Sequence, residues 1–139
     1  MAETILVRDV MVKNPKVVRR DTSVQEVVAT MNKFDISSVI VVQDERPVGI
    51  ITHKDVMEKI VQPRIPPDAV TAREIMSTPV ATINEDAGIE EAVRLMARKN
   101  VKKLPVVTDN KLVGIITSLD LVREQPKLIA LMEDLLKGS

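Results

Sequence analysis

The chain has 139 residues, 45% of them apolar, and balances 20 lysine and arginine residues against 20 aspartate and glutamate residues. A chain of this length buries about two-thirds of its unfolded surface as one compact unit, and the absence of cysteine excludes disulfides and thiolate metal sites. The net charge of zero gives no overall attraction to nucleic acids or anionic membranes. Because the N-terminus lacks a basic secretory start and no apolar run is long enough for a membrane span, we expect a cytoplasmic protein.

The sequence repeats itself at a shift of 65 positions. Residues 24–58 align with residues 89–123 without a gap, and twelve of these 35 pairs are identical. We therefore predict a duplication, with a first repeat over residues 1–62 and a second over residues 63–125.

Each repeat carries the same order of predicted elements. In the first repeat, apolar spacing and polar turns predict a helix over 24–31, strands over 39–42 and 48–51, and a helix over 54–61. In the second repeat they predict a helix over 89–96, strands over 104–107 and 113–116, and a helix over 119–123. Ser23 is expected to cap the first of these helices through a capping box, and Asp86 the equivalent helix of the second repeat.

These elements predict an α+β fold of two βαββα repeats. Because uniformly apolar strands need cover on both faces, we expect the repeats to pack sheet to sheet about a pseudo-two-fold axis. Three prolines within residues 62–68 predict the linker between them. Residues 126–139 predict a C-terminal amphipathic helix that packs on its own body or on a sister subunit, since Glu133 and Asp134 oppose contact with anionic lipid.

The side chains needed for common chemistries are missing. His53 is the only histidine, so neither a nucleophile–base–orienter set nor a zinc site of nitrogen and sulfur ligands can be assembled. The glycine-rich loops GxxxxGK[ST] and GxGxxG are also absent. We expect no enzyme activity, no catalytic residues and no metal-ligating residues.

A strand end with a polar pair occurs twice, at Gly49–Asp55 and at Gly114–Asp120. Each segment reads Gly-Ile-Ile-Thr-x-x-Asp. The threonine and the aspartate fit a helix cap. They equally fit a ligand site in which helix N–H groups meet an anion and the carboxylate accepts ribose hydroxyls.

These segments, the βαββα order and the Leu104–Val107 run resemble a tandem pair of CBS (cystathionine-β-synthase-type) domains across residues 5–125. The resemblance implies two clefts that bind adenosyl ligands such as AMP, ADP, ATP, S-adenosylmethionine or NAD, in a sensor rather than an enzyme. It also implies a homodimer formed through the closing helices and an effector protein that responds in trans. Which ligand binds, whether both clefts fill and whether Mg²⁺ accompanies a triphosphate stay open.

The resemblance also implies particular ligand-binding residues. The ribose-binding acids are Asp55 and Asp120, and the adjoining hydroxyls are Thr52 and Thr117. After alignment of Pro15 with Pro79, the base pockets are Thr78, Ile83 and Val101 in one cleft and Asn14, Arg19 and Ile36 in the other, where Arg19 departs from an apolar wall. The phosphate-binding cations are Lys102 and Lys103, with Lys54 as a third. The alternative for the two lysines is a solvated basic edge at a helix end.

Two other functions remain in competition with the sensor. A ligand-free module for protein interaction or dimerisation would keep the fold and show no response to nucleotides. Nucleic-acid binding, which we do not expect, would rest on a basic set of Arg19, Arg20, Arg98, Lys99, Lys102 and Lys103.

Overall fold

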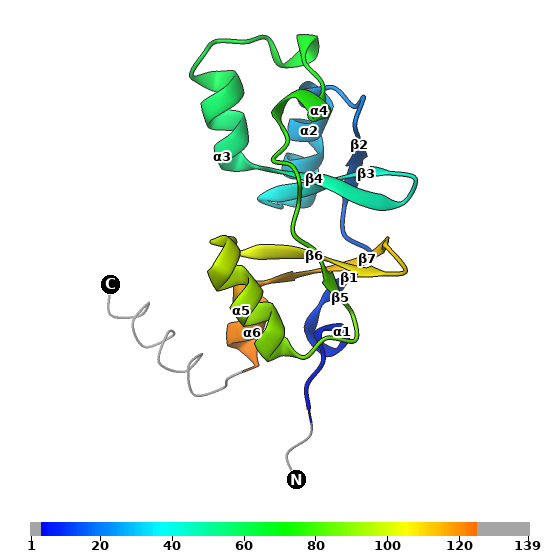
Figure 1. Cartoon of the computed structure of the whole chain (residues 1–139). Coiled ribbons are helices and arrows are strands. Elements are labelled where there is room, and N and C mark those ends of the chain that lie inside the picture. Colours follow the sequence, from blue (N-terminus) through cyan, green and yellow to red (C-terminus); the bar gives the residue numbers. More distant parts are fainter. Residues whose placement is uncertain (1–3, 125–139) are drawn as a thin grey trace, which may run out of the picture.

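The computed structural model describes residues 4–124, which form two α+β units with helices on the outer side of each sheet (Figure 1). The first half of the chain comprises α1 (Val7–Val10), β1 (Val12–Lys13), β2 (Val17–Arg19), α2 (Val24–Phe34), β3 (Ser38–Gln43), β4 (Arg46–Thr52), α3 (His53–Val56) and the π-helical turn η1 (Met57–Val61). The second half comprises the 3₁₀ turn η2 (Pro67–Ala69), α4 (Ala72–Ile75), β5 (Ile83–Asn84), α5 (Ile89–Lys99), β6 (Lys103–Thr108), β7 (Lys111–Thr117) and α6 (Ser118–Arg123). The predicted βαββα order is confirmed in both halves.

The two sheets have matching topology. In the first, β2 runs parallel to β3, which pairs antiparallel with β4. In the second, β5 runs parallel to β6, which pairs antiparallel with β7, and β1 adds a short edge strand to β7. Both hairpins turn through two residues in the left-handed region, which Asp and Asn tolerate better than most residues. The predicted polar turns are therefore confirmed.

The two long helices follow their sequence signals except at one cap. Ser23 caps α2 as predicted, by accepting a hydrogen bond from the Glu26 amide at 3.2 Å, but the Glu26 side chain makes no return bond to the Ser23 amide, so the predicted capping box is incomplete. The predicted cap at Asp86 is wrong, because α5 begins after Gly88 without a side-chain cap. The backbone bends differently there, since the Asn84 side chain accepts from the Asp86 amide at 2.9 Å and holds this segment in a turn before the helix begins.

The opening segment of each repeat packs on the opposite unit. The core of the first unit, built on residues such as Val27 and Ile51, takes in Ala72 and Ile75 of α4. The core of the second unit takes in Val7 of α1. This exchange ties the two halves together, because neither core is complete without a segment from the other repeat.

The two sheets face each other at the centre of the molecule, with α2 and α3 beyond one sheet and α5 and α6 beyond the other (Figure 1). A hydrogen bond of 2.9 Å from the Leu112 amide to the Glu45 carbonyl joins the two hairpins. None of the helices within residues 4–124 combines the length and apolar character of a membrane span. The helix predicted over 126–139 lies outside the described residues.

Candidate functional site

A cavity of about 830 Å³ opens between the two repeats, at the point where β4 ends and α3 begins. Segments from both halves of the chain line it. The lining residues are Ser37, Ile50, Thr52, His53, Lys54, Asp55, Glu58, Lys59, Ser77, Pro79, Val80, Ala81, Asn100, Val101, Lys102 and Lys103. Five predicted site residues are thereby brought together with Asp55, namely Thr52, Lys54, Val101, Lys102 and Lys103.

Hydrogen bonds hold the carboxylate of Asp55 in place at the N-terminus of α3. Its Oδ2 accepts from the backbone amide of Thr52 at 2.9 Å and from the Thr52 hydroxyl at 3.2 Å, while the Asp55 amide donates to that hydroxyl. Its Oδ1 faces Ser77 Oγ at 3.4 Å and Lys59 Nζ at 3.2 Å. Thr52 and Asp55 therefore form the complete capping box of α3, and the box leaves the carboxylate fixed beside the cavity.

The amides at the start of α3 are largely occupied. The His53 amide donates to the Ser37 carbonyl at 3.1 Å, and the Asp55 amide is used by the cap. The expectation that free helix N–H groups would hold an anion here is therefore wrong for two of the first three amides. Binding of an anion has to rely on side chains instead.

Four lysines and two carboxylates line the cavity, which gives an excess of two positive charges over the lining. Lys59 pairs with Asp55, and Lys54 lies 3.7 Å from Glu58. Among the described residues, no carboxylate pairs with Lys102 or Lys103. These two cations are the ones left for an anionic ligand.

Lys103 reaches across the pseudo-two-fold axis. Its ammonium donates to the hydroxyls of Ser37 and Ser38, the second at 2.9 Å. Burial lowers the pKa of Lys103 from its ordinary value, because partial removal from water disfavours the charged form. Ser37 and Ser38 occupy in the first repeat the positions of Lys102 and Lys103 in the second, so the paired positions meet at the axis.

The apolar wall of the cavity differs from the predicted one. Ile83 is only 5% exposed and packs inside the second core, where it pairs with Val106, so its predicted place in the base pocket is wrong. Val80 and Ala81, just before it, line the cavity in its place. The hydroxyl of Thr78 donates to the Val48 carbonyl at 3.0 Å, and its neighbours Ser77 and Pro79 face the cavity instead.

The predicted second cleft keeps its acid but loses one wall residue. Asp120 forms the same capping box with Thr117, with a bond of 2.9 Å to the Thr117 amide, and its other oxygen lies 3.9 Å from Arg123. Its side chain is 12% exposed, the same fraction as that of Asp55. Ile36 packs against the first core, and Asn14 is exposed with a φ of 54°. Their participation in a second cleft stays a prediction.

Arg19 does not belong to that cleft. In the ladder with β3 it pairs with Val42 near the hairpin turn, at the far end of the strand from Ser38. Val18 pairs with Val41 as Ile83 pairs with Val106, so Val18 is the structural counterpart of Ile83. The equivalence between Arg19 and Ile83, which relied on the proline alignment, is therefore wrong by one residue.

The sequence analysis did not identify several residues that line the cavity, because contacts between distant segments bring them there. Ser77 reaches Asp55 only through the exchange of α4, and an isolated bridge between Ser77 and Ile50 fixes it there. Lys59 is one helical turn after Asp55, and this i, i+4 spacing was an available signal.

Among residues 4–124, no group of three or more His, Cys, Asp and Glu side chains is arranged to hold a metal ion.

Comparisons with known proteins show the family to which this fold belongs. The CBS domain family matches residues 7–62 and again residues 72–127. The chain therefore belongs to the CBS domain family and carries a tandem pair of these regulatory modules.

An uncharacterized protein of Methanopyrus kandleri is 42% identical over 132 residues, which cover 94% of this chain and 65% of that protein. This chain thus spans just under two-thirds of that relative's length. An uncharacterized conserved protein from Pyrococcus horikoshii has 30% identity and a TM-score of 0.78, covering 89% of this chain and 94% of that one. The CBS domain pair of protein MJ0100, solved in complex with 5′-methylthioadenosine and S-adenosyl-L-methionine, has 31% identity and a TM-score of 0.77, with 87% and 95% covered.

Proposed function

We propose that this chain is a regulatory module that binds an adenosyl ligand in the cavity beside Asp55 and signals its occupancy to a partner protein without catalysis. The observation that carries the proposal is the convergence of a fixed carboxylate, an apolar wall and two unpaired lysines on one cavity of about 830 Å³. The carboxylate suits a pair of ribose hydroxyls, the wall suits a purine face, and the lysines suit phosphate.

The charge of the cavity favours phosphorylated ligands. Its lining carries four lysines against Asp55 and Glu58, an excess of two positive charges. The sulfonium of S-adenosylmethionine is a cation and would meet this excess unfavourably, whereas AMP, ADP and ATP bring compensating negative charge. The similar CBS pair that holds 5′-methylthioadenosine and S-adenosyl-L-methionine supports the adenosyl part of the ligand and leaves the phosphate part to be argued from the lysines.

The first experiment is calorimetric titration of the whole chain with adenosine, AMP, ADP, ATP, S-adenosylmethionine and NAD, each with and without Mg²⁺. The variant is Lys102→Ala, and the matched control is Lys99→Ala, which removes the same charge from α5 outside the cavity lining. Loss of one charge-assisted hydrogen bond costs about 1.5–3 kcal/mol, or roughly 10- to 100-fold in affinity. We expect this loss for the phosphorylated ligands in Lys102→Ala only, with adenosine unchanged in both variants.

Two outcomes would count against the proposal. If none of the six compounds binds, the chain is the ligand-free interaction module instead. If Lys102→Ala and Lys99→Ala weaken the phosphorylated ligands equally, the lysines are a solvated basic edge. A matched pair, Asp55→Asn and Asp120→Asn, removes one capping carboxylate from each half of the chain and shows which cleft holds the ribose.

Homodimerisation through the closing helices is part of the proposal. Met57 and Val61 lie four residues apart on η1 and are 58% and 54% exposed, and Leu119 on α6 is 47% exposed. Apolar side chains this exposed on the closing elements support a subunit contact. Analytical ultracentrifugation should give a dimer for the chain and a monomer for Val61→Glu. A dimer that survives Val61→Glu would place the contact elsewhere.

A further inference from the structure

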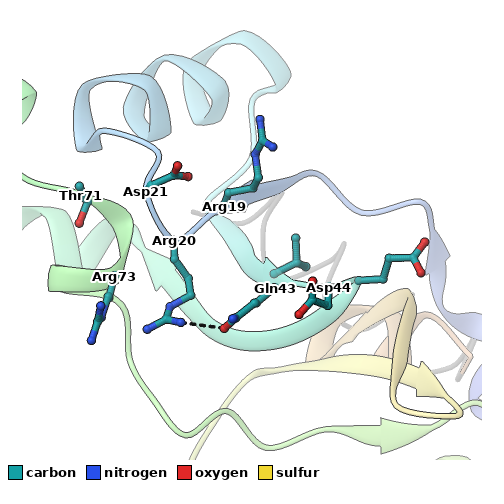
Figure 2. Close-up of a pocket in the computed structure, with 9 residues that line it drawn as sticks. Arg19, Arg20, Asp21, Gln43, Asp44, Thr71 and Arg73 are labelled. Atoms are coloured by element: carbon teal, nitrogen blue, oxygen red, sulfur yellow. Dashed lines mark hydrogen bonds between the residues drawn. The ribbon is translucent and has the colours of Figure 1, made fainter.

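A second cavity, of about 650 Å³, lies on the first unit and shares no lining residue with the cavity beside Asp55. It is bounded by the loop between β2 and α2, the β3–β4 hairpin and the start of α4, and Figure 2 shows its lining. Arg20 and Arg73 extend to the same side in this view, whereas Arg19 extends away from them. The backbone brings the two together, since the Arg73 amide donates to the Arg20 carbonyl at 3.0 Å.

Arg20 has an unmet hydrogen bond. Its Nη1 donates to Gln43 Oε1 at 2.7 Å, but its Nε is buried and has no hydrogen-bond partner among residues 4–124. A buried charged donor without an acceptor is costly and unusual. Within residues 4–124, no carboxylate forms an ion pair with Arg20 or Arg73. The two neighbouring guanidinium groups therefore form no ion pair with the described part of the chain, although Asp21, Asp44 and Glu45 line the same cavity.

At the equivalent place in the second unit, carboxylates of the chain itself contact the arginine and the hairpin strand. At the shift of 65 residues, Arg73 corresponds to Arg8 and Arg20 to Glu85, and the Arg8 amide donates to the Glu85 carbonyl at the same 3.0 Å. Arg8 forms an ion pair with Asp86, and the Glu85 carboxylate accepts from Thr108. In the second repeat the carboxylates come from the chain itself.

The first repeat carries a second arginine where the second repeat carries the Glu85 carboxylate. Glu85 corresponds to Arg20, and the partner of each is on the hairpin strand, Thr108 in one repeat and Gln43 in the other. The remaining acid, Asp21, corresponds to Asp86 but points away from both guanidinium groups (Figure 2). The first unit thus keeps the backbone contact and the acid at position 21, but it lacks an ion pair equivalent to that of Arg8 with Asp86.

We infer that Arg20 and Arg73 form a binding site for a small phosphate-bearing anion, which supplies the counter-charge that Asp86 gives to Arg8 in the second unit. Planar guanidinium groups match the oxygens of phosphate in paired hydrogen bonds, and the buried Nε supplies one donor that is already desolvated. Asp44 and Glu45 at the rim disfavour a long polyanion, so the ligand is a free phosphate or a compact phosphate ester rather than a nucleic acid.

The test is titration of the whole chain with inorganic phosphate, followed by ³¹P NMR and calorimetry, with sodium chloride at matched ionic strength as the reference. A glycerol phosphate arm separates a free phosphate from an esterified one. We expect phosphate binding beyond the chloride effect, weakened about tenfold or more by Arg73→Gln. Arg19→Gln is the matched control, since Arg19 lines the same cavity but points away, and it should leave the affinity unchanged.

Two further measurements make the result unambiguous. Arg73→Gln lies outside the cavity beside Asp55 and should leave the nucleotide affinities of that cavity unchanged, so failure of this inference is separate from failure of the proposed function. Arg20→Glu copies the second repeat by placing a carboxylate where the guanidinium was, and it should abolish the phosphate response because it removes the buried donor and adds a negative charge beside Arg73. Equal responses to phosphate and chloride, or equal loss in Arg73→Gln and Arg19→Gln, would overturn the inference.

Discussion

Two glycines mark where the exchanged segments approach the sheets, and they allow the exchange to be tested through stability. A Cβ added at Gly49 would lie 2.5 Å from Met76 Sδ and 2.8 Å from Met76 Cγ. A Cβ added at Gly114 would lie 2.7 Å from Met11 Sδ and 2.9 Å from the carbonyl oxygen of Val12. The first clash involves a flexible side chain, and the second also involves backbone.

This difference predicts unequal costs for the two alanine substitutions. Gly49→Ala needs Met76 to move, and overpacking of this kind costs about 1–3 kcal/mol. Gly114→Ala should cost more, because the Val12 carbonyl cannot move without disturbing the pairing of β1 with β7. With a urea m value of about 2 kcal/mol per molar, a loss of about 2 kcal/mol lowers the unfolding midpoint by about 1 M.

Urea unfolding of single and double variants measures the effect. The pair Gly49→Ala and Met76→Ala should be markedly non-additive, with a coupling of about 1–3 kcal/mol, because the second change removes the clashing atoms. Gly88→Ala is the control for the clash, since its nearest atoms lie at 4.0 Å, and it should cost no more than about 1 kcal/mol, because alanine is a poorer N-cap than glycine. Wild-type midpoints for Gly49→Ala and Gly114→Ala would refute the reasoning about the exchanged segments.

Three further predictions concern the capping acids, the buried lysine and a strained helix end. Asp55→Ala should destabilise the chain by about 1 kcal/mol more than Asp120→Ala in urea unfolding, because both lose a cap but only Asp55 has a short ion pair and a serine contact. Since the pKa of Lys103 is lowered in the folded chain, the unfolded chain binds more protons between that lowered pKa and 10.5, so this group's contribution to stability rises with pH there. The stability difference between wild type and Lys103→Met should show this slope from alkaline unfolding curves, and a flat difference would contradict it. Asp35→Gly should raise the free energy of unfolding by up to about 1 kcal/mol, because Asp35 ends α2 with a φ of 52° that glycine adopts without strain. A higher melting temperature would show this gain.

Much of the fold follows from local signals in the sequence. The shift of 65 residues, the apolar spacing of α2 and α5, and the alternation of strands and polar turns predicted every long element and its order. The Thr52–Asp55 box was also readable, because a capping box is made by residues three positions apart. These features depend on neighbours in the chain, which a sequence displays directly.

Part of the site followed from the resemblance and part did not. Lys102, Lys103 and Val101, which the resemblance named as ligand-binding residues, line the same cavity as Asp55, and they follow a helix end that the repeat pattern locates. Arg19 and Ile83 were misplaced, because a single-residue error in register moves a side chain to the other face of a strand. The pairing of β2 with β3 decides that register.

The remaining features depend on contacts between distant segments, and only the tertiary structure decided them. Ser77 reaches Asp55 because α4 packs on the first unit, and Lys103 reaches Ser37 and Ser38 because the two repeats meet at their common axis. The proximity of Arg20 and Arg73 also depends on the tertiary structure, since the two residues are more than fifty positions apart in the sequence. The sequence by itself determined the repeated unit and its local caps, whereas the exchange of segments determined which side chains share a cavity, because no periodicity along the chain encodes a long-range contact.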